Sequence, residues 1–340
     1  MRAAVIRQHG TIDEISVEND WPDPEPGSGQ AILKVEACAL NYHDLFTLKG
    51  MPGIRIGFPR IMGIDCAGTI VALGDGVDGW SIGERVVIHP IATGNRPGLI
   101  GETHDGGLAE YVLVDAEQLC AMPESVSFAQ AAALPCAYGT AYRMMVRRGR
   151  IAAGEKVLIL GASGGVGTCC VQLAKAAGAE VIATASSDEK LQRLAELGAD
   201  HLINYAESDF FAEVIERFGK PRVMGGGGVD VVVNFTGGET WVPSLRCLTK
   251  NGRLLTCGAT AGFDPKTDIR YIWTFEQNII GSNGWSMEDV QELLAMVERG
   301  QLKALVDRTL PLEETQEAFR LLRDREVFGK VIVSPTQGTS

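Results

Sequence analysis

The stretch Val157–Lys175, VLILGASGGVGTCCVQLAK, decides how the central part of this chain is organised. It begins with an apolar run typical of a buried strand, continues through glycines 161, 164, 165 and 167, and then takes on helical spacing. Glycines at a strand-to-helix turn let the backbone approach a pyrophosphate, and the helix N-terminus supplies N–H donors. The stretch therefore predicts a dinucleotide-binding turn. The alternative is an ordinary glycine-rich turn in another α/β fold.

Strands and helices alternate on the C-terminal side of this turn. Strand patterns occupy residues 180–186, 201–205, 228–237 and 277–284, and helical patterns occupy residues 187–199 and 210–218. Residues 244–258 continue the alternation, and residues 127–149 resemble a helix interrupted near Pro135. Such alternation is typical of a parallel sheet with helices on both faces. We therefore expect an α/β fold with a doubly wound sheet at residues 126–284.

The flanking segments follow a different pattern. Residues 1–125 contain short β-like runs punctuated by Gly, Pro and Asp, which predicts an all-β, partly barrel-like domain. After Trp285, two helical patterns at 286–302 and 312–325 precede a last strand at 329–335. We expect residues 285–340 to return to the first domain.

Composition excludes several classes of protein. The formal net charge is −12 and no stretch forms a basic patch, which argues against a nucleic-acid partner. No apolar run is long enough to span a membrane, and the N-terminus lacks a signal-peptide core. The eight cysteines are scattered and do not resemble a disulfide framework. A cytoplasmic location is the expectation.

The end of the second strand indicates which nucleotide binds. NAD-binding sites usually place an acidic residue there to hold the ribose 2′-hydroxyl. This chain instead has Ala185 followed by Ser186 and Ser187, with Lys190 one helical turn further on. Small hydroxyl residues and a lysine would accept a 2′-phosphate, so NADP(H) is favoured. The alternative for Lys190 is a solvated helix lysine, and the nearby Asp188 weakens the case.

Several motifs, taken together and in order, resemble the medium-chain dehydrogenase/reductase superfamily, in particular its zinc-independent quinone oxidoreductase branch. They include ALNYHD, GIDCAGTIVALGDGVDGWSIGERV, GGLAEYVLV, GASGGVG, LGADHLINY, GRLLTCG, NIIGS and REVFGKVIV, and they cover nearly the whole chain. The resemblance implies a GroES-like catalytic domain, a Rossmann domain and a nicotinamide held in a cleft between them. It also implies a homodimer in which the strand of NIIGS pairs with its copy.

The resemblance supplies a test for zinc. Metal-bearing members carry a cysteine where this chain has Asn41, a histidine where it has Ile64, and a third ligand where it has Cys136. Isoleucine cannot bind zinc and asparagine is a poor ligand, so two of the three positions are lost. The segment that would hold the structural zinc has no cysteine. We expect no metal, although a substitute site built from Cys38, His43, Cys66 and Cys136 stays open.

The resemblance also implies the residues that contact the cofactor. Tyr205 joins Ser186 and Lys190 as a candidate contact to the 2′-phosphate. Later strands end in NFTGG and CGAT, at the sheet edge where such folds bind ligands. The predicted cofactor-binding residues are Gly161, Ser163, Gly164, Gly165, Val166, Gly167, Ser186, Lys190, Tyr205, Asn234, Thr236, Gly237, Gly258 and Ala259.

The candidate catalytic residues are Asn41, Tyr42, Tyr138 and Cys136. By resemblance, Asn41 lies beside the nicotinamide and could donate a hydrogen bond to a developing oxyanion. Either tyrosine could supply the proton, or could simply pack with its hydroxyl bonded to backbone. Cys136 is either a reactive thiol or a relic. His43 is either a surface residue or a catalytic one.

Without a Lewis acid, the site suits acceptors whose reduced product is a stabilised enolate or hydroquinone. We therefore expect an NADPH-dependent, zinc-free reductase of quinones or α,β-unsaturated carbonyls acting on a small molecule. The alternatives are an alcohol or aldehyde dehydrogenase of the same superfamily, and a non-enzymatic NADPH-binding or redox-sensing protein. The loops expected to form the substrate pocket carry Arg55, Arg60 and Arg270, which would suit a bulky or mildly anionic substrate.

Overall fold

The computed structural model describes residues 1–51, 53–94 and 96–336, and it divides into two compact units. The first unit comprises Met1–Gly139 and Trp285–Ser340, and the second comprises Thr140–Gly284. The chain returns to its first unit at Trp285. The other division falls after Gly139, later than the predicted start at 126. No helix among the described residues is long and apolar enough to cross a membrane.

The first unit is built mainly from antiparallel strands. Its largest sheet has the order β10-β6-β5-β3-β18-β17, with β9 also paired to β3. These strands are β3 (Gln30–Ala39), β5 (Asp65–Leu73), β6 (Arg85–Ile88), β9 (Tyr111–Asp115), β10 (Leu119–Ala121), β17 (Val306–Pro311) and β18 (Lys330–Ser334). A second sheet joins β2 (Ser16–Glu18), β1 (Ala3–Ile6) and β4 (Arg60–Ile61), and a third joins β7 (Ile91–Ala92) to β8 (Gly98–Leu99). This is the predicted GroES-like β domain.

Two features of the first unit differ from the all-β prediction. Helix α1 (Tyr42–Lys49) follows β3 directly, because Asn41 caps it and Asp44 accepts a hydrogen bond from the Asn41 backbone N–H at 2.7 Å. Residues 126–139 also belong here, through α2 (Phe128–Ala132) and the wide helical turn Leu134–Tyr138. Proline at position 135 lacks a backbone donor, which accounts for the predicted interruption. Helices α9 (Met287–Glu298) and α10 (Thr315–Arg323) complete the unit.

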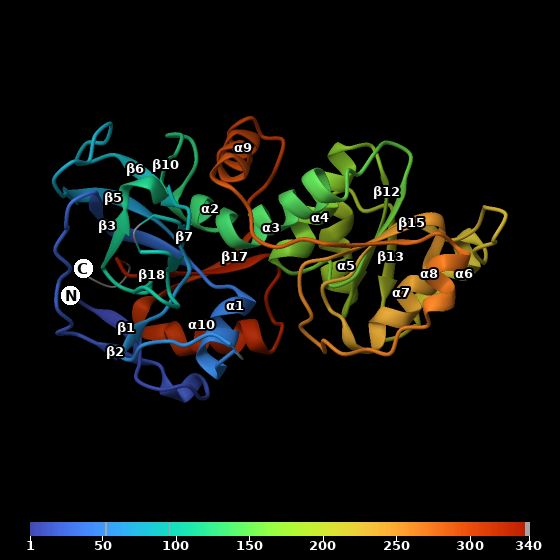
Figure 1. Cartoon of the computed structure of the whole chain (residues 1–340), viewed down its shortest axis with the longest axis horizontal. Coiled ribbons are helices and arrows are strands. Elements are labelled where there is room, and N and C mark those ends of the chain that lie inside the picture. Colours follow the sequence, from blue (N-terminus) through green and yellow to red (C-terminus); the bar gives the residue numbers. More distant parts are fainter. Residues whose placement is uncertain (52, 95, 337–340) are drawn as a thin grey trace. The chain divides into compact units, whose positions relative to one another are not determined.

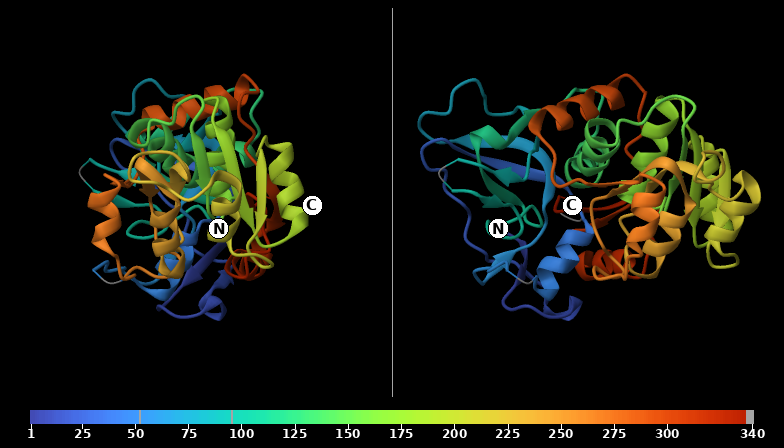
Figure 2. Two further views of the ribbon diagram at one scale, coloured as in Figure 1. Left: turned by 90° about the vertical axis from the view of Figure 1, so that its right-hand side faces the viewer. Right: turned by 45° about the vertical axis from the view of Figure 1, so that its right-hand side comes forward.

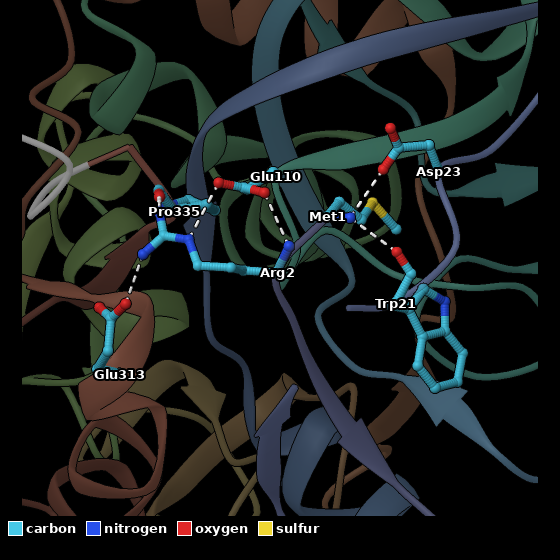
Figure 3. A network of polar contacts seen from close by, with 7 residues as sticks. All are labelled: Met1, Arg2, Trp21, Asp23, Glu110, Glu313 and Pro335. Atoms are coloured by element: carbon cyan, nitrogen blue, oxygen red, sulfur yellow. Dashed lines mark hydrogen bonds and ion pairs between the residues drawn. The ribbon is translucent and has the colours of Figure 1, made fainter. Parts of the chain in front are cut away.

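The two ends of the sequence are held together within the first unit. Figure 3 shows Arg2 between two carboxylates, donating to Glu110 at 3.0 Å and to Glu313 at 2.5 Å. The same guanidinium donates to the Pro335 carbonyl at 2.6 Å. Strand β18 reaches the middle of the main sheet, where Val333 pairs with Cys38 of β3. These contacts explain why the C-terminal segment belongs with the N-terminal domain.

The second unit is the predicted doubly wound Rossmann domain. Its six strands are all parallel in the order β13-β12-β11-β14-β15-β16. They are β11 (Lys156–Ile159), β12 (Glu180–Ala185), β13 (His201–Asn204), β14 (Val229–Val233), β15 (Leu248–Thr256) and β16 (Asn278–Gly281). The connecting helices are α4 (Gly165–Ala176), α5 (Asp188–Glu196), α6 (Phe210–Phe218), α7 (Trp241–Cys247) and α8 (Ile269–Thr274), preceded by α3 (Gly139–Tyr142) and the wide turn Arg143–Arg148. Figures 1 and 2 show helices on both sides of this sheet.

Burial explains why the strands are so apolar. Val157, Leu158 and Ile159 of β11 are fully buried in the middle of the second unit, as a strand covered on both faces requires. In the first unit the buried side of β3 carries Leu33 and Val35, while Lys34 between them is exposed. The two patterns of hydrophobicity therefore produce the two kinds of sheet.

Candidate functional site

A buried polar cluster lies where β3 ends and α1 begins. Asn41 is 6% exposed, and Asp44, one turn into α1, is fully buried. Asp65 opens β5 directly opposite Ala39 and is also fully buried. It accepts hydrogen bonds from the Asn41 side-chain amide at 3.0 Å and from the Cys136 backbone N–H at about 3.0 Å. The structure therefore brings three predicted regions of the chain, around residues 41, 65 and 136, to one point.

Lys330 supplies the positive charge of this cluster and is not among the site residues predicted from the sequence. It is the first residue of β18 and is only 3% exposed. Its ammonium donates to the Leu40 carbonyl at 2.6 Å and to the side-chain oxygen of Asn41. The Asn41 amide nitrogen also donates to the Ala39 carbonyl at 3.3 Å. Within the protein, the Asn41 side chain thus has partners for its acceptor and for both amide hydrogens.

Burial dominates the electrostatics of the cluster. It raises the pKa of Asp44 to about 6, although the Asn41 N–H and the charges of His43 and Lys330 act in the opposite direction. Burial likewise raises the pKa of Asp65 to about 6, against the charge of Lys330 and the hydrogen bonds from Asn41 and Cys136. One Asp44 carboxylate oxygen has no hydrogen-bond partner in the described structure. Two carboxyl groups with pKa values of about 6 and one ammonium group therefore share this site.

The donor set at this site does not fit a zinc ion. The Asn41 oxygen faces the Lys330 ammonium, and Asp65 is occupied by the donors of Asn41 and Cys136. Ile64 is buried and has no ligand atom. Cys38 and Cys66 pair across β3 and β5, and burial raises the pKa of both thiols, so they do not readily become thiolates. Among the described residues, no three His, Cys, Asp or Glu side chains are grouped to hold a metal.

His43 forms an ion pair with Glu102, a residue that was not predicted from the sequence. Its Nε2 lies 2.6 Å from a carboxylate oxygen of Glu102, whose side chain is only 8% exposed. Burial lowers the pKa of His43, but the hydrogen bond to Glu102 and the charges of Glu102, Asp44 and Asp65 outweigh it, so the net shift is upward. The pair places a titratable hydrogen-bonded group beside the buried cluster.

The three remaining catalytic candidates have different environments. Tyr42 is half-buried beside Phe46, and its hydroxyl forms no hydrogen bond within the described residues. Tyr138 is fully buried, donates to the Lys303 carbonyl at 3.1 Å and accepts from the Leu305 N–H at 3.0 Å. Its prediction as proton donor is therefore revised, because the geometry is that of a packed core tyrosine. Cys136 is half-exposed, and its backbone N–H holds Asp65.

The glycine-rich turn of the second unit has the geometry that a pyrophosphate site requires. Gly161 has φ +65° at the end of β11, and Gly164 caps α4. A Cβ at Gly167 would lie 2.4 Å from the Gly161 carbonyl oxygen, so only glycine lets α4 pack this closely against the turn. Ser163, Gly165 and Val166 are partly exposed and complete the turn. These residues fit a dinucleotide.

The residues expected at the 2′-phosphate lie at the ends of two neighbouring strands. Ala185 of β12 pairs with Asn204 of β13. Ser186 and Tyr205 are the next residues after this pair on the two strands, and both are exposed. Lys190 lies in the first turn of α5, where its backbone N–H is capped by Ser187 at 3.4 Å. Asp188, which weakened the NADP(H) prediction, accepts a hydrogen bond from Asn204 at 2.9 Å. This contact gives its carboxylate a partner inside the protein.

The last group of predicted cofactor contacts lies in the loops after β14 and β15. Asn234 is fully buried; its amide donates to Thr240 and Ser244, and its oxygen accepts from the N–H groups of Thr236 and Gly237. Asn234 is therefore revised from a cofactor contact to a residue that shapes the turn. Gly237 has φ +69°, and a Cβ there would lie 2.3 Å from the Gly262 carbonyl oxygen. Gly258 is exposed and Ala259 partly exposed at the C-terminal end of β15.

Two of the three arginines expected to meet the substrate are ion-paired within the protein. Arg60 contacts Asp105 at 2.8 Å, and Arg270, at the start of α8, contacts Asp268 at 2.7 Å. The sequence predicts loops at residues 46–60 and 268–277, which carry these arginines, but α1 extends to Lys49 and α8 spans Ile269–Thr274. Arg55 forms no ion pair with any other residue that the structure describes.

Comparisons with known proteins agree with this architecture. Residues 27–124 match the family described as "Alcohol dehydrogenase GroES-like domain", and residues 165–299 match "Zinc-binding dehydrogenase". An acryloyl-coenzyme A reductase of Sulfurisphaera tokodaii is 31% identical over 98% of this chain and its own full length. A quinone oxidoreductase of Rattus norvegicus is 30% identical over 98% of this chain and 97% of its own.

Solved structures resemble the whole chain as well. A structure titled as an NAD-dependent alcohol dehydrogenase has a TM-score of 0.90 at 35% identity, covering 98% of this chain and 99% of its own. A crotonyl-CoA carboxylase/reductase in complex with NADP has a TM-score of 0.85 at 26% identity, covering 98% of this chain and 94% of its own. A GroES-like unit followed by a dinucleotide-binding unit defines a two-domain dehydrogenase class. This chain belongs to the medium-chain dehydrogenase/reductase superfamily.

Proposed function

We propose that this chain is an NADP(H)-dependent, zinc-independent reductase of quinones or α,β-unsaturated carbonyl compounds. It is an oxidoreductase of the medium-chain superfamily, and NADP(H) is its cofactor. The observation that carries the proposal is the hydrogen bond from the Lys330 ammonium to the Asn41 side-chain oxygen, because Asn41 stands where, by the resemblance, zinc-type relatives carry a metal ligand. The names of the relatives, an acryloyl-CoA reductase and a quinone oxidoreductase, support this substrate class.

The chemistry follows from the absence of a fitting zinc donor set. When bound, NADPH would supply a hydride from its nicotinamide ring. A simple ketone needs strong polarisation of its oxygen, whereas an enone or quinone delocalises the incoming charge into an enolate or hydroquinone. The glycine turn Gly161–Gly167 would hold the pyrophosphate by backbone donors. Ser186, Lys190 and Tyr205 would favour the 2′-phosphate over a bare hydroxyl.

The reduction also needs a proton. Tyr42 is the proposed donor, because its half-buried hydroxyl has no hydrogen bond within the described residues. His43, held by Glu102, is the alternative source, and its raised pKa keeps more of it protonated near neutral pH. Asn41 is proposed to position this helix start rather than to act alone, because its amide groups are already engaged.

We also propose a homodimer. Strand β16 lies at the end of the strand order and pairs only with β15 within the described chain. Ile279 in this strand is 40% exposed, and an uncovered edge strand with an apolar residue is a ready surface for strand addition.

The test is a metal analysis joined to an activity assay. Protein purified without chelator is analysed for zinc and then assayed for NADPH oxidation with menadione and with 3-penten-2-one. We expect substoichiometric zinc and turnover that survives 1,10-phenanthroline. About one zinc per chain, with activity lost on chelation, would instead favour the alcohol dehydrogenase alternative. NADPH binding without turnover on any acceptor would favour the non-enzymatic alternative.

A further inference from the structure

A cavity of about 540 Å³ opens at the C-terminal ends of β15 and β16, entirely within the second unit. Among the residues that line it are Arg143, Arg148, Cys257, Gly258, Gly281 and Ser282. This is the sheet edge at which a doubly wound fold binds its ligands. Gly258, which we expected to contact the cofactor, is one of its walls. A molecule held here would therefore lie beside the predicted cofactor-binding residues of this unit.

The charge in this cavity is positive. Its two arginines come from the wide helical turn Arg143–Arg148, and no carboxylate side chain is among its described lining residues. The Arg148 guanidinium donates through Nε to the Gly281 carbonyl at 3.1 Å, which fixes it at the end of β16. Within the described residues, neither arginine forms an ion pair. Arg60, Arg253 and Arg270, by contrast, each contact a carboxylate.

Two buried polar groups in the cavity wall have no partner. Ser282 is 9% exposed, and its hydroxyl forms no hydrogen bond in the described structure. The Nε of Arg143 is likewise buried without an acceptor. Buried donors are nearly always satisfied in folded proteins, by the protein or by something bound to it. A hydroxyl and a guanidinium N–H that lack acceptors in one cavity point to an acceptor supplied by a ligand.

The backbone around these groups leaves room for that ligand. A Cβ at Gly281 would meet nothing within 4 Å, and one at Gly258 would meet only Phe235, at 3.6 Å or more. Guanidinium groups bind planar or tetrahedral oxyanions through paired N–H donors, and a serine hydroxyl adds a third. The cavity thus offers hydrogen-bond donors, positive charge and an open approach to one kind of group.

We propose that this cavity is a subsite for an anionic oxygen group, a carboxylate or a phosphoryl group, carried by the acceptor substrate. Arg143 and Arg148 neutralise its charge, and Ser282 donates a hydrogen bond to it. The inference rests on the proposed reductase function, which it deepens: the physiological acceptor is an unsaturated carbonyl compound that bears a negative charge.

The test compares two acceptors of similar size, one charged and one neutral: trans-4-oxo-2-pentenoate and its methyl ester. In the native protein we expect the higher kcat/KM for the carboxylate. Arg143→Gln and Arg148→Gln should each lower kcat/KM for the carboxylate about tenfold, through KM, and leave the ester within about twofold. Arg150→Gln, at an exposed arginine two positions after Arg148 that is not among the lining residues, is the matched control and should change neither. Ser282→Ala should weaken carboxylate selectivity without destabilising the free protein, because its hydroxyl has no partner there.

Competing ions distinguish the two sources of charge at constant ionic strength. Inhibition of the carboxylate reaction by inorganic phosphate alone assigns the subsite to a phosphoryl group, and inhibition by acetate assigns it to a carboxylate. An equal decrease in kcat/KM for the carboxylate and for the ester in the arginine variants would overturn the proposal. So would a rise in the KM for NADPH alone, which would assign the arginines to the cofactor.

A binding measurement separates this proposal from the proposed function. The melting temperature of the protein is recorded with 4-oxo-2-pentenoate and with the ester. A rise in melting temperature with the carboxylate that disappears in Arg148→Gln supports the subsite, even if the protein reduces neither compound. Failure to reduce either compound would count only against the proposed substrate class. No rise in the native protein, together with no difference between the acceptors, would overturn the subsite.

Discussion

The ammonium of Lys330 donates a hydrogen bond to the side-chain oxygen of Asn41, although 289 positions separate the two residues in sequence. Both are buried, and the Asn41 amide nitrogen in turn donates a hydrogen bond to the Asp65 carboxylate at 3.0 Å. Asn41 stands where, by the resemblance, zinc-type relatives carry a metal ligand, and in this chain its oxygen faces a buried ammonium group.

Lys330→Met should destabilise the protein strongly at neutral pH. The substitution keeps the length of the side chain but leaves two buried carboxyls and the Asn41 oxygen without their cation, so we expect a loss of about 3 kcal/mol in the free energy of unfolding at pH 7. The loss should be smaller at pH 5, where both carboxyls, with pKa values of about 6, are largely protonated. Urea unfolding at the two pH values measures this, with the exposed Lys266→Met as the control. An equal loss at both pH values would show that Lys330 acts by packing alone.

The buried carboxyl of Asp44 should make stability depend on pH in an unusual direction. Its pKa is raised from 3.8 to about 6 in the folded protein, so between these values the folded state holds more protons than the unfolded state. The stability that proton binding at Asp44 gives the folded state is fully present below about pH 4 and is lost as the pH rises through 6. Relative to the native protein, Asp44→Asn should gain about 3 kcal/mol of unfolding free energy between pH 4 and pH 7, as measured by urea unfolding across that range. The exposed Asp75→Asn should show no such gain, and parallel pH profiles for native and Asp44→Asn proteins would contradict the prediction.

The sequence predicted the fold well because each unit has its own period of hydrophobicity. The apolar run of β11 is buried on both faces, whereas β3 alternates in its middle, where Leu33 and Val35 are buried and Lys34 is exposed. Helix α1 was missed, although Asn41 and Asp44 stand at capping-box spacing and could have indicated it.

The site was predicted less completely, because its contacts join residues far apart in sequence. Asn41 was found within a local motif, whereas Lys330 reaches it only through the pairing of β18 with β3. A single lysine opening the buried strand KVIVS was the available signal. The hydrogen bonds that engage Tyr138 and Asn234 are created by the folded chain, so residue type alone could not separate them from functional groups.

Ser186→Asp should reverse the preference between the two nicotinamide cofactors. Ser186 is exposed at the end of β12 beside Tyr205, and a carboxylate there would repel a 2′-phosphate and accept a hydrogen bond from a ribose 2′-hydroxyl. We expect the KM for NADPH to rise at least about tenfold while that for NADH falls. Steady-state kinetics with one acceptor and both cofactors measures the ratio. An unchanged ratio would mean that the 2′-phosphate lies elsewhere, and Ser81→Asp, at an exposed serine of the first unit, should leave the ratio unaltered.

The edge of the second sheet should mediate association of two copies of the chain. Ile279 is 40% exposed on β16, which has a neighbour on one side only in the described chain. Ile279→Lys places a charge on this edge, a substitution that opposes strand-to-strand association. We expect the native protein to elute at the mass of a dimer in size-exclusion chromatography with light scattering, and the variant to shift toward 36.4 kDa, the mass of one chain. Ile82→Lys, which alters a more exposed isoleucine at 69% on the first unit, is the control and should leave the dimer intact. A native monomer, or a dimer that survives Ile279→Lys while Ile82→Lys dissociates it, would place the contact on another surface.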